Sequence, residues 1–330
     1  MKNMKSPLIV SPLDSYDDVE KLVTAGADEF YCGILTNDWY HIYAPASIDR
    51  RPKGQAHFES FDELQKRVEK AHSLGAKINI TINEHYYTPE QYDYIDEFIK
   101  NAISIKADSL IISDPALIFY IKEKKIPIKV HLSTGGVCLN SETAKFFTEA
   151  GVSRIILPRH LSLDEIETIL DVEGVEFETF IFNSRCVNVD GLCTFQHGLS
   201  GAKVELYYKN ACMLPYDIHV LTRKPTDDEK KINAGKRQKI WEYVHIDDFP
   251  CGACALFEFS EFGIKAVKIV GRGNDSERKL KDVKFFSMLK SLLNDGIDKV
   301  SFREETKRLY KEFYDRKCRY HMCYYPEAMS

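Results

Sequence analysis

The sequence predicts an α/β fold in which about eight parallel strands close into a (β/α)8 barrel of the TIM type. Short β-branched runs alternate with amphipathic helical stretches along most of the 330 residues, and this alternation is typical of a parallel sheet. No glycine-rich dinucleotide fingerprint follows the first strand, which disfavours a Rossmann fold. A doubly wound open sheet stays the structural alternative, because alternation alone does not show closure.

Each strand candidate is a short run of β-branched or aromatic residues. Strands are expected at 8–10, 29–31, 78–81, 109–112, 128–130, 154–157, 177–182 and 266–270. Helices are expected between them at 16–24, 61–74, 89–104, 115–124, 141–150 and 163–170. Ser162 lies three residues before Glu165 in a capping-box pattern, and the glycines at 26 and 151 suit left-handed helix ends.

Two insertions interrupt this rhythm. The first, at 35–60, is rich in aromatic and basic residues, and the second covers about 183–263, between the seventh and eighth strands. We therefore expect one barrel over 1–280, including the second insertion, and a helical C-terminal tail over 281–330 packed on it. Because the loops after the strands line the catalytic face of such barrels, the second insertion is expected over the barrel mouth.

Composition disfavours several classes of protein. The formal charge is −5, and the 45 basic residues are spread among 50 acidic ones. The sequence therefore has no basic stripe of the kind that is typical of a dedicated nucleic-acid binder. No apolar run approaches the ~20 residues that a membrane-spanning helix needs, and the first ten residues lack the apolar core of a signal peptide. Nine cysteines without an export signal favour the reducing cytoplasm.

Four cysteines of the second insertion indicate a metal centre. Six residues separate Cys186 from Cys193, eighteen separate Cys193 from Cys212, and thirty-eight separate Cys212 from Cys251. Thiolates are soft ligands that suit zinc or an iron–sulfur cluster. A four-cysteine zinc site usually has two close pairs, and only Cys251 and Cys254 have that spacing, so an iron–sulfur cluster is favoured over zinc. Cys254 is the alternative fourth ligand, and buried packing cysteines without a metal are the plainest alternative.

The other cysteines are interpreted as packing residues. Cys32 ends a predicted strand and could face the barrel mouth, whereas Cys138 follows the fifth strand. Cys318 and Cys323 could hold a second metal together with His321. Burial of the aromatic tail against the barrel explains this last pair more simply.

Several segments, in the right order over most of residues 8–275, resemble peptidase family U32, the collagenase-like proteases. The signature comprises Glu178, Phe180, Ser184, Cys186, Gly191 and Cys193, and further pieces are 25–31, 133–134, 159–165 and 268–272. The chain departs from the family pattern at four positions. Asn183 replaces a glycine, Arg185 an apolar residue, Gln196 a serine and Val270 a glutamate.

The resemblance implies a barrel in which Cys186, Cys193, Cys212 and Cys251 bind a 4Fe–4S cluster. It also implies oxygen-independent hydroxylation of ubiquinone precursors or RNA bases, with prephenate as the oxygen donor. The family label implies a peptidase, but neither a Gly-x-Ser-x-Gly elbow nor a His-Glu-x-x-His helix is present.

Four side chains just beyond predicted strand ends are candidates for catalysis: His85, His131, Arg159 and Arg272. The two arginines would suit a dicarboxylate ligand through bidentate contacts, unless each pairs with a neighbouring acid. Either histidine would suit proton transfer, unless it is a hydrogen-bonded structural residue.

The primary hypothesis is an iron–sulfur barrel enzyme, or an enzyme subunit, that hydroxylates a small organic substrate without oxygen. The alternatives are a peptidase acting on a peptide substrate, and a non-catalytic iron–sulfur partner of another family member. A nucleic acid is disfavoured by the net charge. The first insertion, with Arg50, Arg51 and its aromatic residues, would serve equally as a substrate lid or as a dimer interface.

Overall fold

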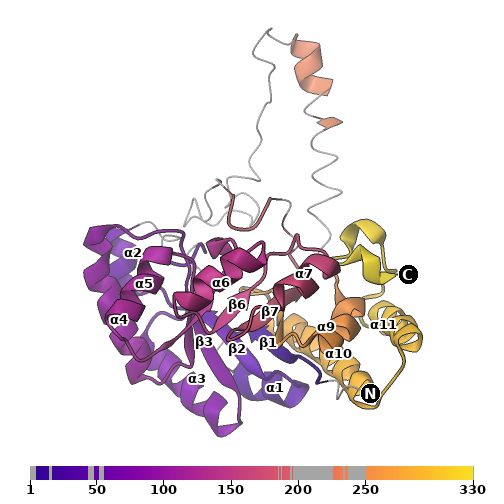
Figure 1. The fold of residues 1–330 in the computed structure, drawn as a ribbon, viewed down its shortest axis with the longest axis horizontal. Helices are drawn as coiled ribbons and strands as arrows, with labels where there is room; N and C mark the ends of the chain where they lie inside the picture. Colours follow the sequence, from indigo (N-terminus) through magenta and orange to yellow (C-terminus); the bar gives the residue numbers. More distant parts are fainter. Residues whose placement is uncertain are drawn as a thin grey trace.

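Eight parallel strands close into a barrel in sequence order, which confirms the predicted (β/α)8 fold (Figure 1). The computed structural model describes residues 5–14, 17–43, 48–51, 56–184, 186, 188–193, 195, 226–232, 235–236 and 250–329. The strands are β1 (Leu8–Pro12), β2 (Glu29–Gly33), β3 (Lys77–Ile82), β4 (Ser109–Ile112), β5 (Lys129–Leu132), β6 (Arg154–Ile156), β7 (Glu176–Phe182) and β8 (Ala266–Ile269). Strand β1 pairs with both β2 and β8, and this last pairing closes the sheet.

The helices alternate with the strands as predicted and cover the outside of the barrel (Figure 1). They are α1 (Asp18–Ala25), α2 (Asn37–Ile42), α3 (Phe61–Ser73), α4 (Tyr92–Ser104), α5 (Pro115–Glu123), α6 (Ser141–Glu149), α7 (Leu163–Ile169), α9 (Leu256–Phe262), α10 (Ser276–Asn294) and α11 (Lys299–Tyr314). The predicted caps are present, since Ser162 and Glu165 form a capping box and Gly26 ends α1 with φ of +113°. Among the described residues, no helix combines the length and the apolar character needed to cross a bilayer.

Helix α10 completes the helical layer, because it packs against both α1 and β1. The expected boundary between barrel and tail, at 280/281, falls inside this helix. Beyond it, α11 packs on α10 and the short helices η7 (Tyr320–Met322) and η8 (Pro326–Met329) follow. The Tyr325 hydroxyl donates to the Phe180 carbonyl at 2.9 Å, so the end of the tail is tied to β7.

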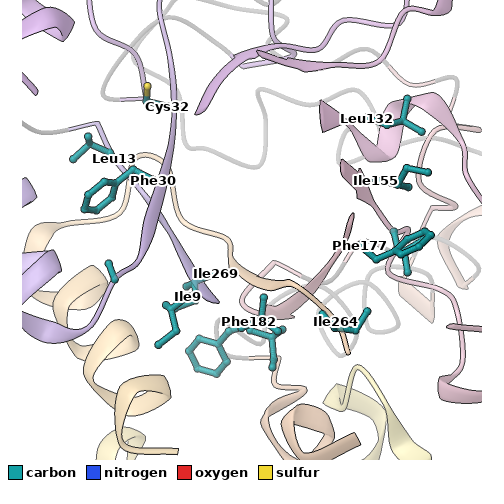
Figure 2. Packing of buried hydrophobic residues seen from close by; sticks show 14 of the residues in the cluster. Ile9, Leu13, Phe30, Cys32, Leu132, Ile155, Phe177, Phe182, Ile264 and Ile269 are labelled. Atoms are coloured by element: carbon teal, nitrogen blue, oxygen red, sulfur yellow. The ribbon is translucent and has the colours of Figure 1, made fainter. Parts of the chain in front are cut away.

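The main core lies between the strands and the surrounding helices. In Figure 2 its labelled side chains ring the barrel, from Phe30 on one side to Ile155 and Phe177 on the other. Cys32 belongs to this core and is fully buried, and burial raises the pKa of its thiol to about 12. Cys138 is also fully buried. Both positions agree with the packing interpretation, and Cys32 does not face the mouth.

The inside of the barrel contains charged and polar side chains beside a small apolar cluster. Arg154, on β6, donates to Glu29 at 2.7 and 3.0 Å and to Glu178 at 3.2 Å. Lys268, on β8, donates to Glu178 at 2.9 Å and lies 4.2 Å from the centre of the Tyr31 ring. These buried ion pairs lie toward the amino ends of several strands and form the floor beneath the mouth.

Candidate functional site

The first insertion brings a buried acid, Asp49, to the carboxyl ends of the strands. Its carboxylate accepts hydrogen bonds from Arg272 Nη1 at 2.5 Å, from Thr81 Oγ1 at 3.0 Å and from the His57 ring at 2.8 Å. Burial alone would raise the pKa of Asp49, but Arg272 and His57 outweigh it and hold that pKa well below its ordinary value. Arg272 therefore lies at the mouth, as predicted, but one edge of its guanidinium is already occupied by an acid.

Gly33, the last residue of β2, makes room for this group. A Cβ atom there would collide with Arg272 Nη1, with Asp49 Oδ2 and with the His57 ring. Only a residue without a side chain lets the Asp49 ion pair rest on the strand end. The geometry of the pair thus depends on one glycine of the barrel.

Replacing Gly33 with alanine is expected to lower the free energy of unfolding by about 1–3 kcal/mol, since the new methyl group must displace a buried ion pair. Urea denaturation measures this change. Gly235→Ala is the control, because a Cβ at that position meets no atom within 4 Å. Equal effects of the two substitutions would contradict the packing argument.

Arg159 holds the signature loop in place. Its backbone N–H and Nε both donate to Asp190 Oδ2 at 2.9 Å, and Nη2 donates to Asp190 Oδ1 at 2.6 Å. Nη1 donates to the Ser184 carbonyl at 2.5 Å. Arg159 is therefore at the predicted place after β6, but its guanidinium clamps the loop that carries Cys186 and Cys193.

The start of this loop explains one departure from the family pattern. Asn183 and Ser184 have φ of +64° and +46°, a left-handed conformation that glycine adopts without strain and asparagine tolerates. The Asn183 amide also donates to the Val270 carbonyl at 3.0 Å and to Asp282 at 2.8 Å. Asn183 thus replaces a glycine and adds two hydrogen bonds that anchor the end of β7.

The structure describes three of the four predicted cluster ligands, while Cys212 lies outside the described residues. Cys186 and Cys193 are both partly exposed on the clamped loop and interact electrostatically. Cys251 forms a backbone bridge with Phe182, the last residue of β7. All three are therefore anchored around the carboxyl end of one strand, and this soft donor set suits an iron–sulfur cluster chemically.

The surroundings of Cys251 differ from those of the other two ligands. Its backbone also forms a parallel β-bridge with Cys323. Burial raises the pKa of the Cys251 thiol well above its ordinary value, and the neighbouring thiols of Cys254, Cys323 and Cys318 raise it further. Within the described ranges, no three His, Cys, Asp or Glu side chains stand close enough together to hold a metal ion. The four-thiolate cluster, and the choice between Cys251 and Cys254, stay predictions.

The two candidate histidines have different positions. His85 follows β3 and its ring lies against Gly135, after the end of β5. Its Nε2 atom is buried and, among the described residues, has no hydrogen-bond partner. Burial and then Arg50 lower the pKa of His85, so the ring is neutral near pH 7 and could accept a proton.

His131 does not lie beyond its strand, which corrects the predicted position. Strand β5 extends to Leu132, and the His131 ring is buried inside the barrel, where Nδ1 lies 3.2 Å from Ser109 Oγ. Burial, followed by Arg154 and Lys268, holds the pKa of His131 well below its ordinary value. Its surroundings suit a neutral structural histidine, and its catalytic role stays a prediction.

The first insertion divides into a packed part and a part at the mouth. Trp39 is 4% exposed and its ring packs on Tyr43 and Tyr87, so Trp39 is not part of a free lid. Burial lowers the pKa of the Arg51 guanidinium, and the nearby positive charges of Arg272 and Arg159 lower it further. Sequence reasoning missed Asp49 and undervalued Arg51, although an acid beside two arginines was visible in the sequence.

Comparison with known proteins assigns the chain to a family. The model of peptidase family U32 matches residues 14–329. The tRNA hydroxylation protein P of Haemophilus influenzae is 29% identical over 201 residues, 58% of this chain and 39% of that protein. A 23S rRNA 5-hydroxycytidine synthase of Escherichia coli is 29% identical over 218 residues, 66% of this chain and 31% of that protein.

A collagenase of Porphyromonas gingivalis is 26% identical over 196 residues, 56% of this chain and 44% of that protein. The chain thus spans less than half the length of each of these three relatives. The family model, in contrast, covers nearly the whole chain, including the clamped signature loop and the mouth arginines. The protein therefore belongs to peptidase family U32.

Proposed function

We propose that this protein takes part in the oxygen-independent hydroxylation of an RNA base. The observation that carries the proposal is the signature loop, which Arg159 clamps at the barrel mouth through three hydrogen bonds to Asp190. The names of the tRNA and rRNA relatives support the reaction, and they favour RNA over the small organic substrate of the primary hypothesis. The net charge of −5 does not oppose this, because Arg51 at the mouth has no acidic partner among the described residues.

In this proposal Cys186, Cys193, Cys212 and Cys251 hold a 4Fe–4S cluster, with Cys254 as the alternative to Cys251 and zinc as the alternative metal. A cluster bound by four thiolates supplies electron transfer. The residues of the chain do the rest. Arg159 and Asp190 orient the ligand-bearing loop, and neutral His85 accepts a proton at its unpartnered Nε2 atom.

Anaerobic purification tests the cluster. Cys186→Ser is expected to lose most of the iron and sulfide, whereas Cys138→Ser should keep both. Cys138 is the matched control, since its thiol contacts the Asn140 carbonyl and a hydroxyl can donate to the same atom. Wild-type protein without iron and sulfide would contradict the cluster.

Mass spectrometry of nucleosides tests the reaction. Deleting the gene is expected to remove a hydroxylated nucleoside from tRNA or rRNA, and restoring the wild-type gene, but not the Cys186→Ser variant, should return it. Unchanged nucleosides would contradict RNA as the substrate. Loss of a hydroxylated small metabolite instead would support a small organic substrate.

The collagenase relative makes a peptidase the second candidate. Anaerobically purified protein incubated with denatured collagen should leave it intact under the hydroxylation proposal. Fragments that disappear with the Arg159→Met variant would favour the peptidase. A protein that works only as an iron–sulfur partner would co-purify with a second family member and show no turnover alone.

A further inference from the structure

Among the described residues at the barrel mouth, one arginine has no acidic partner to neutralise its charge. Three arginines around it have acidic partners: Arg50 pairs with Glu84 at 3.1 Å, Arg159 with Asp190 at 2.6 Å and Arg272 with Asp49 at 2.5 Å. Arg51, in the part of the chain that the structure describes, forms neither an ion pair nor a hydrogen bond. Among the described residues, the mouth thus carries an excess positive charge on a side chain that is only partly exposed to water.

The surroundings of Arg51 make its charge costly. Burial lowers the pKa of its guanidinium most, and Arg272 lowers it further, while Tyr31 and Asp49 oppose them. Asp49 is the acid that acts on Arg51, but Arg272, His57 and Thr81 already occupy its oxygens. A cation kept in such a place opposes folding unless something else neutralises it.

A second observation points to a ligand at the same place. Arg272 is 9% exposed and His57 is 8% exposed, and both surround Asp49. Arg272 Nε and His57 Nδ1 are buried and have no hydrogen-bond partner within the described ranges. Because buried polar atoms are nearly always hydrogen-bonded, these atoms indicate a place where a polar group is missing. Arg272 Nε, moreover, can only donate.

We propose that Arg51, together with Arg272 Nε, binds an oxyanion at the barrel mouth, a carboxylate or a phosphate group of the ligand that enters there. An oxyanion neutralises the excess charge and accepts hydrogen bonds from both guanidinium groups, which present planar donor edges. This assignment differs from the expected pair of Arg159 and Arg272, because Arg159 is fully engaged by Asp190 and Ser184.

The inference rests on the proposed function for the identity of the ligand, but anion binding can be measured without turnover. Isothermal titration calorimetry and thermal unfolding of the purified full-length protein use two probes, sodium malonate and sodium phosphate, at constant ionic strength. Saturable binding of at least one probe, with a rise in the melting temperature, is the expected result. Preference for malonate assigns a carboxylate, and preference for phosphate assigns a phosphate group.

Two neighbouring variants separate this site from general charge effects. Arg51→Met is expected to weaken binding of the preferred probe at least about tenfold, as loss of a charged hydrogen-bonding group does. Arg50→Met removes the same charge one position away, and the contact that it breaks is the ion pair with Glu84. The affinity of this variant for the preferred probe should stay within about twofold of the wild type, a smaller change than the loss of one charged contact with the probe would cause.

Without a ligand, Arg51→Met should melt at the same temperature as the wild type or higher, because an unneutralised and partly buried charge is removed. A ligand-free Arg51→Met protein that melts well below both the wild type and Arg50→Met would assign Arg51 a structural role and overturn the proposal. So would wild-type protein that binds neither probe, or equal loss of binding in both variants. If the protein binds the anion but no hydroxylated nucleoside depends on its gene, this inference holds and the proposed function fails.

Discussion

Replacing Arg154 with methionine is expected to lower the free energy of unfolding by about 3–5 kcal/mol, because it leaves a buried carboxylate without its ion-pair partner. The Arg154 side chain is 2% exposed, and Glu29 and Glu178 are each 1% exposed. Lys268 would still pair with Glu178, whereas Glu29 would keep the Asn79 amide but lose its cation. Chemical denaturation at pH 7 measures the change.

The pH dependence gives this prediction a sign. Burial raises the pKa of Glu29, but Arg154 outweighs burial and the net pKa lies below its ordinary value. The ion pair therefore stabilises the wild type fully at pH values above the ordinary pKa of a glutamate. This stabilisation is lost as the pH falls through the lowered pKa of Glu29. In the variant the pKa of Glu29 should rise, so its stability deficit should be smaller at pH 5 than at pH 8.

Arg308→Met is the matched control for the interior pair. Arg308 forms ion pairs with Glu305 and Glu312 on the exposed face of α11, and exposed pairs of this kind contribute little to stability. No measurable change is expected for the control. A deficit for Arg154→Met that is equally small, or that grows as the pH falls, would contradict the role assigned to the barrel interior.

Replacing Arg159 with methionine is expected to lower the free energy of unfolding by about 2–4 kcal/mol and to loosen the loop that carries Cys186 and Cys193. Asp190 is 6% exposed, and it would lose both of its hydrogen bonds to the Arg159 guanidinium together with the positive charge of that group. The anaerobically purified variant should contain less iron and sulfide than the wild type and should release them faster to a chelator.

Arg159→Lys separates positioning from simple charge. Lysine keeps the positive charge but cannot form the bidentate contact with Asp190, so it should recover part of the stability and little of the iron retention. Lys145→Met, which breaks an exposed pair with Glu142 on α6, is the control. Unchanged iron content and release in Arg159→Met would show that the clamp does not position the cluster ligands.

Local sequence patterns predicted the elements of the fold because they depend on local rules. The capping box at Ser162 and Glu165 is present as expected, and every predicted strand overlaps one in the structure. The end of β5 was misjudged, since the run at 128–130 extends through His131 to Leu132 once β4 and β6 pair with it. Pairing with neighbours decides where a strand ends, and this moved His131 from the mouth into the barrel.

The sequence predicted where the two arginines of the candidate site lie, but it did not predict their ion-pair partners. Arg159 and Arg272 do follow β6 and β8, because strand order places such residues at one end of a parallel barrel. Their acids, Asp190 and Asp49, come from the two insertions, whose paths no periodicity predicts. The acids decide that Arg159 positions a loop and that Arg51 carries the unneutralised charge.

By itself, the sequence determined the barrel class, the helix caps and the family signature, since alternation, capping and motif spacing are properties of short segments. Only the tertiary structure decided which charges neutralise one another, because ion pairs such as Arg154 with Glu29 join residues 125 positions apart. Closure of the barrel brings these side chains within hydrogen-bond distance and removes them from water. The strength and the sign of their interactions depend on that burial, and no local pattern contains it.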